Sequence, residues 1–138
     1  MPTGICIIAH APLASALKTC AEHVYSTTGD KSAERIVAWD VPCGIDVEAG
    51  LEHGRELVET LCAHNDGVLI FTDLTGATPG NIARRLLADK RVRVVSGTNL
   101  PAIVAALSAP ADAPLSQVAT IAEAAARASL SALVDICD

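Results

Sequence analysis

Two residues able to do chemistry stand directly after apolar stretches of this 138-residue sequence. His10 follows the run Gly4–Ala9, and Asp73 follows the run Gly67–Thr72. A histidine at the end of a strand can act as a nucleophile, a general base or a metal ligand. A carboxylate that binds one ring nitrogen fixes the tautomer and leaves the lone pair of the other nitrogen free to accept an electrophile. His10 and Asp73 are therefore the predicted catalytic pair.

The peptide after the second apolar stretch has the features of an anion-binding loop that leads into a helix. Pro79 favours the first position of a helix, and Thr78 is expected to be its N-cap. Backbone N–H groups around Gly80, together with the helix dipole, would form a nest for an anion. A later peptide, Gly97–Pro101, opens a helix in the same manner, and Asn99 would either brace that loop or contact the anion. The predicted phosphate-binding residues are Thr75, Thr78, Gly80, Asn81 and Asn99.

An imidazole nucleophile, an orienting carboxylate and helix N-termini together suit a transferring phosphoryl group. Structural alternatives stay open, because His10 could be an ordinary strand-end histidine, Asp73 could cap a turn, and Thr78 caps a helix in either case. Arg84 and Arg85 belong to a basic cluster that would either face solvent or dock an acidic or phosphorylated partner. No Gly-x-x-x-x-Gly-Lys-Ser/Thr loop and no Gly-x-Gly-x-x-Gly occurs, so no motif supports nucleotide binding.

Apolar strands alternate with amphipathic helices along the sequence, which predicts an α/β fold with a parallel sheet. The predicted strands are Gly4–Ala9, Arg35–Trp39, Gly67–Thr72 and Arg91–Ser96. The predicted helices begin at Leu13, after Asp46 as N-cap, at Pro79, at Pro101 and after Ser116 as N-cap. We expect a single open, mostly parallel four-stranded sheet of order 2-1-3-4 with helices on both faces. Because ligands bind beyond the carboxyl ends of such strands, where the strand order reverses, His10 and Asp73 should face each other.

The composition is that of one folded domain, residues 1–138, with a connector at 109–114 and a C-terminal helix and tail at 115–138. Apolar residues make up 51% of the chain and charged residues 19%, which excludes disorder. A net charge of −6 and an aromatic share of 2% argue against nucleic acid as a partner. No apolar run approaches about 20 residues, so we expect no direct membrane insertion and a cytoplasmic protein. Five scattered cysteines predict neither a disulfide framework nor a metal site.

The three polar peptides resemble, in their order and spacing, the mannose-type IIA domain of the phosphoenolpyruvate-dependent sugar phosphotransferase system (PTS). The resemblance covers about residues 4–108. It rests on the apolar strand and histidine at 5–10, Phe-Thr-Asp-Leu-Thr-Gly-Ala-Thr-Pro-Gly-Asn at 71–81, and Gly-Thr-Asn-Leu-Pro at 97–101. One departure is Ala11-Pro12, since the family usually has glycine after the histidine.

The resemblance implies that His10 accepts a phosphoryl group from the phosphocarrier protein HPr and passes it to a IIB component. It also implies that Asp73 binds the imidazole ring and that Thr78, with nearby N–H groups, holds phosphate oxygens. The family is homodimeric and exchanges an antiparallel C-terminal strand, a part that the tail at 132–137 could play.

The sequence thus predicts a phosphotransferase that works through a phosphohistidine, without metal or other cofactor, in sugar uptake or in regulation. Two alternatives remain at this stage. One is the phosphotransfer subunit of a dihydroxyacetone kinase, which shares the fold and the histidine chemistry but uses a different acceptor. The other is a non-catalytic α/β module that senses a small anion or a nucleotide.

Overall fold

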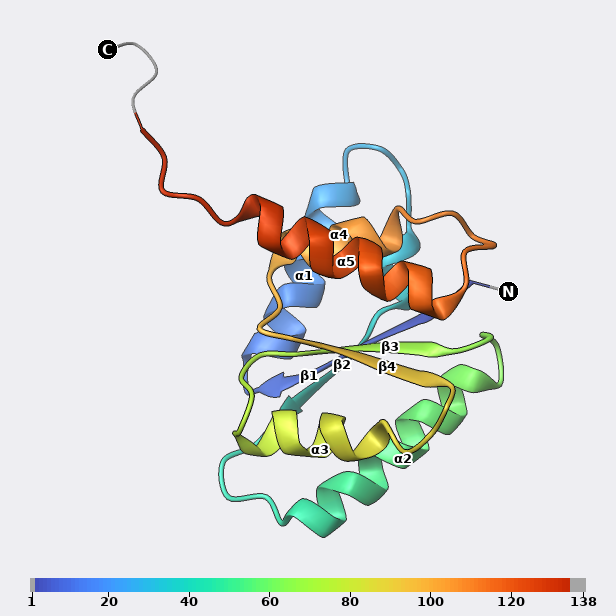
Figure 1. Ribbon diagram of the computed structural model, residues 1–138, viewed down its shortest axis with the longest axis vertical. Helices are drawn as coiled ribbons and strands as arrows, with labels where there is room; N and C mark the ends of the chain where they lie inside the picture. Colours follow the sequence, from blue (N-terminus) through green and yellow to red (C-terminus); the bar gives the residue numbers. More distant parts are fainter. Residues whose placement is uncertain (1, 135–138) are drawn as a thin grey trace.

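The structure, a computed structural model that describes residues 2–134, contains the predicted four-stranded parallel sheet in the order β2-β1-β3-β4 (Figure 1). The strands are β1 (Gly4–His10), β2 (Val37–Val41), β3 (Val68–Thr72) and β4 (Val92–Ser96). The helices are α1 (Leu13–Tyr25), the short 3₁₀ helix η1 (Ser32–Arg35), α2 (Val47–Cys62), α3 (Thr78–Leu86), α4 (Leu100–Leu107) and α5 (Leu115–Ser129). The predicted fold class and strand order are confirmed.

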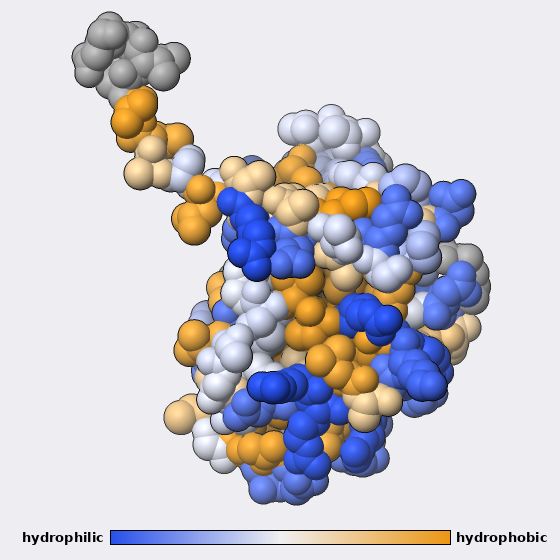
Figure 2. Space-filling view, in the orientation of Figure 1, coloured by the Kyte–Doolittle hydropathy of each residue, from blue (hydrophilic) through white to orange (hydrophobic). Residues whose placement is uncertain are grey.

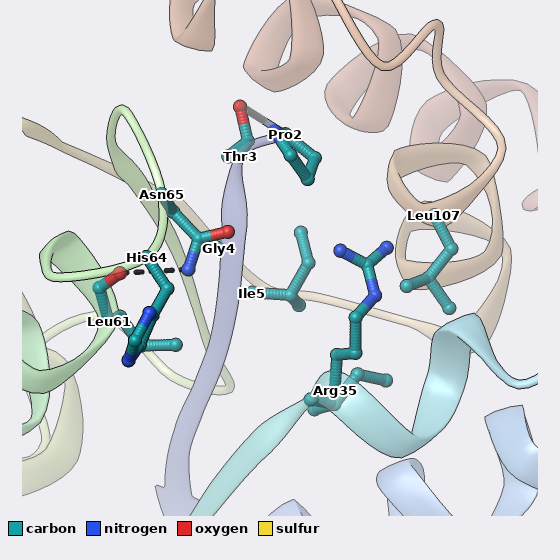
Figure 3. A pocket seen from close by; sticks show the side chains of 10 residues that line it. Pro2, Thr3, Gly4, Ile5, Arg35, Leu61, His64, Asn65 and Leu107 are labelled. Carbon is teal, nitrogen blue, oxygen red and sulfur yellow. Dashed lines mark hydrogen bonds between the residues drawn. The ribbon is translucent and has the colours of Figure 1, made fainter.

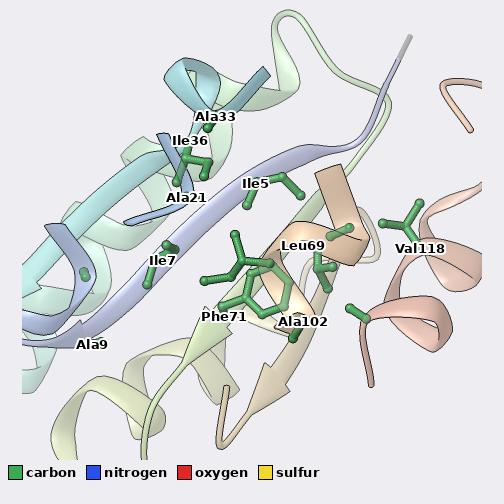
Figure 4. Close-up of a cluster of buried hydrophobic side chains, with 14 residues drawn as sticks. Ile5, Ile7, Ala9, Ala21, Ala33, Ile36, Leu69, Phe71, Ala102 and Val118 are labelled. Atoms are coloured by element: carbon green, nitrogen blue, oxygen red, sulfur yellow. The ribbon is translucent and has the colours of Figure 1, made fainter. Parts of the chain in front are cut away.

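Two hydrophobic clusters, one on each face of the sheet, hold the helices in place. Alternate residues of β1 point to opposite faces, as the two-residue period of a strand requires. Ile5 and Ile7 pack with α1, α4 and α5, and Figure 4 shows this cluster around Phe71 of β3. Cys6 and Ile8 pack with α2 and α3 on the other face. Both faces of β1 and β3 are therefore covered, which explains their continuous apolar sequences.

The register of the sheet brings the ends of all four strands to the same edge. His10 is opposite Val41 of β2, and Thr72 is opposite both Ile8 of β1 and Ser96 of β4. In Figure 1 the start of α3 also lies at this edge, close to the end of β1. The topology thus places His10 and Asp73, at the ends of β1 and β3, next to each other at one edge of the sheet.

Several predicted element boundaries were wrong, including the start of α4, which is Leu100 rather than Pro101. The second strand begins at Val37 rather than Arg35, because residues 32–35 form η1, in which Ala33 is buried against α1. The third helix begins at Thr78, so Ala77 and not Thr78 is its N-cap. The last helix begins at Leu115 after Pro114, so Ser116 lies within it and does not cap it. By contrast, Asp46 caps α2 as predicted and accepts a hydrogen bond from Ala49 N at 3.0 Å.

The predicted C-terminal edge strand is not formed within this chain over residues 132–134, and residues 135–138 lie outside the described part. After α5 the chain leads away from the domain (Figure 1). Its large apolar side chains are almost fully exposed, at 85% for Leu130, 90% for Leu133 and 81% for Val134. An apolar segment of this kind needs a covering surface that residues 2–134 do not supply.

Candidate functional site

His10 and Asp73 meet at the junction between β1 and β3. The Nδ1 atom of His10 lies 2.8 Å from Oδ2 of Asp73, and the same oxygen accepts the backbone N–H of His10 at 3.1 Å. The other carboxylate oxygen accepts the backbone N–H of Leu74 at 2.9 Å. The ring is 48% exposed, whereas the carboxylate is only 13% exposed. Backbone N–H groups thus hold both carboxylate oxygens of Asp73, and the His10 ring bound to it is open to solvent.

The protonation state of Asp73 determines which ring nitrogen is free. Partial burial acts to raise the pKa of this carboxyl, but the hydrogen bonds from the His10 ring and backbone outweigh burial and hold the pKa below its usual value. Asp73 is therefore ionised near neutral pH and can only accept hydrogen bonds. It follows that Nδ1 of His10 carries the proton, and in the neutral ring Nε2 presents its lone pair away from Asp73.

A second carboxylate, missed by the sequence analysis, fixes the helix that follows His10. Asp40 of β2 accepts the backbone N–H of Ser15 at 2.9 Å and its hydroxyl at 2.5 Å. The hydrogen bond from the Ser15 hydroxyl is the main reason that the pKa of Asp40 is lowered. An N-terminal N–H group of α1 is therefore satisfied by a protein carboxylate. No local signal could have found this pair, because it depends on β2 lying beside β1.

The first turn of α3 is the part of the structure that best matches the predicted anion nest. The backbone N–H of Asn81 bonds to the Ala77 carbonyl at 2.8 Å, so Asn81 does not contribute the backbone donor that was expected of it. Within residues 2–134, the N–H groups of Thr78 and Gly80 donate no hydrogen bond, as is usual for a first turn. The nest therefore consists of Thr78 and Gly80, with the positive end of the helix dipole behind them.

Gly80 is also required by packing. A Cβ atom at this position would collide with the carbonyl oxygen of Leu74. The start of α3 thus lies directly against the loop that follows Asp73, and only glycine allows that approach. Gly80 links the position of the carboxylate to the position of the helix.

The remaining predicted phosphate ligands separate into two places. Asn99 accepts the N–H of Ala102 at 3.0 Å and donates to the carbonyl of Ala126 at 3.2 Å, which is the bracing role considered for it. Thr75 instead pairs its hydroxyl with that of Ser96, at 2.7 Å. A groove of about 290 Å³ between α3 and β4 is lined by Thr72, Thr75, Gly76, Gly80, Asn81, Arg84, Leu87, Val94 and Ser96.

The two predicted docking arginines have different surroundings. Arg85 pairs with Glu48 of α2 at 2.6 Å and so joins two helices. Arg84 lines the groove and forms no ion pair with any residue between 2 and 134. Of the two, Arg84 is the cation open to an incoming anion.

A separate cavity of about 270 Å³ lies at the amino-terminal edge of the sheet, with Arg35 and Leu107 on one side of β1 and Asn65 on the other (Figure 3). It adjoins Gly4, whereas the site described above adjoins His10 at the other end of β1. Six residue steps of strand separate them, which is about 20 Å. The two places are therefore independent.

Neither a metal cluster nor a membrane span is found in the part of the chain that the structure describes. No group of three histidine, cysteine, aspartate or glutamate side chains there could hold a metal ion. No described helix is both long enough and apolar enough to cross a membrane.

An exposed imidazole oriented by a carboxylate lies beside a free helix N-terminus on a parallel α/β sheet, an arrangement that suits a phosphoryl carrier. The chain belongs to the family described as the PTS system fructose IIA component, whose family model matches residues 4–134. It is thus a phosphotransferase-type carrier of sugar phosphotransfer, and the family implies interaction with HPr and a IIB component. Nothing in the comparisons favours the dihydroxyacetone kinase subunit or the sensor module.

Several solved structures share the fold. A PTS IIA protein associated with the fucose utilization operon of Streptococcus pneumoniae is 24% identical, with a TM-score of 0.75 and coverage of 95% of this chain and 96% of that one. The PTS component EIIA of Streptococcus agalactiae is 21% identical, with a TM-score of 0.78 and coverage of 99% and 98%. The mannose/sorbose-specific IIA subunit of Enterococcus faecalis is 18% identical, with a TM-score of 0.77 and coverage of 97% and 96%. A comparison with curated proteins finds no match.

Proposed function

We propose that Nε2 of His10 is the atom that accepts and returns the phosphoryl group. The observation that carries this proposal is the 2.8 Å hydrogen bond between Nδ1 and the ionised Asp73. The lone pair of Nε2 attacks the phosphorus of phospho-HPr, a new N–P bond forms, and the N–P bond of the donor breaks with its electron pair returning to the donor nitrogen. The imidazolium charge that results lies against Asp73, which stabilises it.

The free backbone N–H groups of Thr78 and Gly80, with the Thr78 hydroxyl, are the proposed ligands of the phosphoryl oxygens. A phosphoryl transfer with a loose transition state depends mainly on positioning and on stabilisation of oxygen charge. Donors at a helix N-terminus supply both, because they are fixed by the helix before the group arrives. The close contact between Gly80 and Leu74 supports this role by holding the donors against the loop of Asp73.

The surface around His10 suits a protein partner. Leu13 and Leu74, which follow the two catalytic loops, are 38% and 58% exposed. Exposed apolar side chains next to a reactive group are typical of the core of a docking surface. We assign Leu13 and Leu74 to the contact with HPr and IIB. Arg84 would bind an acidic or phosphorylated group of the partner at the edge of this contact. Arg85 instead holds α3 to α2 through its ion pair with Glu48.

The proposed assembly is a homodimer in which the segment after α5 adds to the β4 edge of a second copy. Strand β4 is one of the two edge strands and has no neighbour on its outer side among the described residues. Figure 2 shows apolar surface over β4, between α5 above and α3 below. The exposed residues Leu130, Leu133 and Val134 have the matching apolar character.

Because Cys6, Cys20, Cys43 and Cys62 are free thiols, we place the carrier in the reducing cytoplasm.

The test is the intact mass of the protein after incubation with phosphoenolpyruvate, enzyme I and HPr. The expected product carries one phosphoryl group that is lost in acid, as a phosphoramidate is. His10→Ala should gain none, and His23→Ala, which removes an exposed helical histidine, should gain one. Phosphate on the His10→Ala protein would overturn the assignment.

A further inference from the structure

The first turn of α1, which follows His10 in the chain, has no cap from its own segment. Its N-cap residue is Pro12, which makes no side-chain hydrogen bond, and no acidic residue lies in the turn. The N–H groups of a first turn need partners from outside the helix when local residues supply none. Of the first four residues of α1 only Ala14 is buried, so the turn is anchored to the core mainly through one methyl group.

Asp40 of the neighbouring strand β2 supplies the missing cap. Ala38 of β2 packs in the hydrophobic cluster that holds α1, and Asp40, two residues later, faces the same side of the sheet. Its carboxylate accepts the backbone N–H of Ser15 at 2.9 Å and the Ser15 hydroxyl at 2.5 Å. The place of the first turn of α1 therefore depends on a side chain of β2.

The position of His10 itself does not depend on this contact. Asp73 holds the backbone N–H and the ring of His10, and the N–H of Ala11 bonds to the Val41 carbonyl at 3.1 Å. What Asp40 adds begins further along, in the first turn of α1. The large apolar side chain of that turn is Leu13, which is 38% exposed and which we assign to the contact with HPr and IIB. The Asp40 contact thus acts on the docking surface rather than on the nucleophile.

We propose that Asp40 is a positioning residue for partner docking in phosphoryl transfer. Through Ser15 it fixes the first turn of α1, and so it holds Leu13 in place before the partner arrives. A side chain that is already ordered loses less conformational entropy on binding. The inference rests on the proposed function, because it takes His10 as the phosphoryl acceptor and Leu13 as part of the docking surface.

The experiment measures single-turnover transfer from phospho-HPr to the full chain over a range of phospho-HPr concentrations. Each variant gives a half-saturating concentration, which reports docking, and a limiting rate, which reports the chemistry at His10. Asp40→Ala should raise the half-saturating concentration about three- to tenfold, the range expected when one side chain must be ordered on binding, and should leave the limiting rate within about twofold. Ser15→Ala keeps the backbone hydrogen bond and should raise the half-saturating concentration by only about twofold.

Two further variants separate positioning from a general loss of stability. Asp40→Asn keeps an oxygen for the Ser15 N–H and an amide for its hydroxyl, so it should restore docking to within about twofold of wild type. Asp30→Ala is the matched control, because Asp30 accepts the backbone N–H of Ser32 at 2.8 Å and its hydroxyl at 2.6 Å. This second aspartate–serine pair lies before the start of β2, at the edge of the sheet away from His10, so its loss should change neither quantity.

Four results would overturn the proposal. They are wild-type docking in both Asp40→Ala and Ser15→Ala, a fall in the limiting rate of Asp40→Ala as large as the rise in its half-saturating concentration, docking by Asp40→Asn as weak as that by Asp40→Ala, and an equal rise in Asp30→Ala. Failure of the proposed function has a different signature, because the wild-type protein would then gain no phosphate at all.

Discussion

The imidazole of His10 and the carboxylate of Asp73 lie 2.8 Å apart although 63 residues separate them in the chain. They meet because β1 and β3 are parallel neighbours and both loops leave the sheet at the same edge. Asp73 binds the backbone N–H of His10 as well as its ring, so the carboxylate cannot move away without breaking two bonds. The relationship places the proton on Nδ1 and leaves Nε2 as the nitrogen that we propose to react.

Asp73→Asn should slow phosphorylation of His10 by about 10²-fold or more, because the asparagine amide can donate to Nδ1. The ring would then carry its proton on Nε2, the atom that must attack, an effect known to cost about 10⁴-fold in a serine protease triad. The measurement is the rate of transfer from phospho-HPr in a quenched-flow assay. An unchanged rate in a folded Asp73→Asn protein would contradict the assigned tautomer.

Asp40→Ala should destabilise the protein by about 1 kcal/mol at neutral pH, because Asp40 acts as a capping group for α1. The folded pKa of Asp40 is lowered, so its stabilisation is fully present above its unfolded pKa of about 3.9 and is lost as the pH falls through the folded value. Urea unfolding at about pH 7 and about pH 3 measures both effects. The difference between wild type and Asp40→Ala should shrink at the lower pH, and a difference that stays constant would show that the charge plays no part.

Gly80→Ala should both destabilise the fold and slow phosphoryl transfer. The added Cβ collides with the Leu74 carbonyl, and overpacking of this kind costs about 1–3 kcal/mol. Relief of the collision must move either the start of α3 or the loop of Asp73, and either movement disturbs the site. Thermal unfolding and the transfer rate should therefore change together. Asn81→Ala, one residue further along the same helix and exposed, is the control for unfolding and should change stability by less than about 0.5 kcal/mol.

The features that the sequence predicted correctly are those with a local signal. Continuous apolar runs identified β1 and β3, and His10 and Asp73 at their ends lie side by side as expected. The wrong predictions lie where long-range contacts decide the outcome. Thr78 has the residue type of an N-cap, but the contact of Gly80 with Leu74 accompanies a helix that starts one residue earlier. The hydrogen bonds of Asp40 likewise join elements 25 residues apart in the sequence, so no local pattern marks them.

The oligomeric state should depend on the apolar segment after α5. Leu133→Asp places a charge on a side chain that is 90% exposed in the single chain, so the monomer itself should be unaffected. If the segment adds to β4 of a second copy, the charge would be buried there and the dimer should dissociate. Light scattering after gel filtration measures the mass. A wild-type protein that is monomeric at micromolar concentration, or a Leu133→Asp variant that stays dimeric, would contradict the exchanged strand.

The unpaired hydroxyl of Thr72 should lower the free energy of unfolding of the protein. Valine has the same branched shape, and it removes an atom whose desolvation costs about 1–3 kcal/mol when unpaired. Thr72→Val should therefore raise the free energy of unfolding by about 1 kcal/mol, whereas the same change at the exposed Thr120, whose hydroxyl bonds to Ser116, should change it by less than about 0.5 kcal/mol. A gain in stability of this size would mean that the hydroxyl of Thr72 is unpaired in the folded protein. A loss of stability would instead mean that ordered water already satisfies Thr72, because only a paired hydroxyl stabilises the folded state.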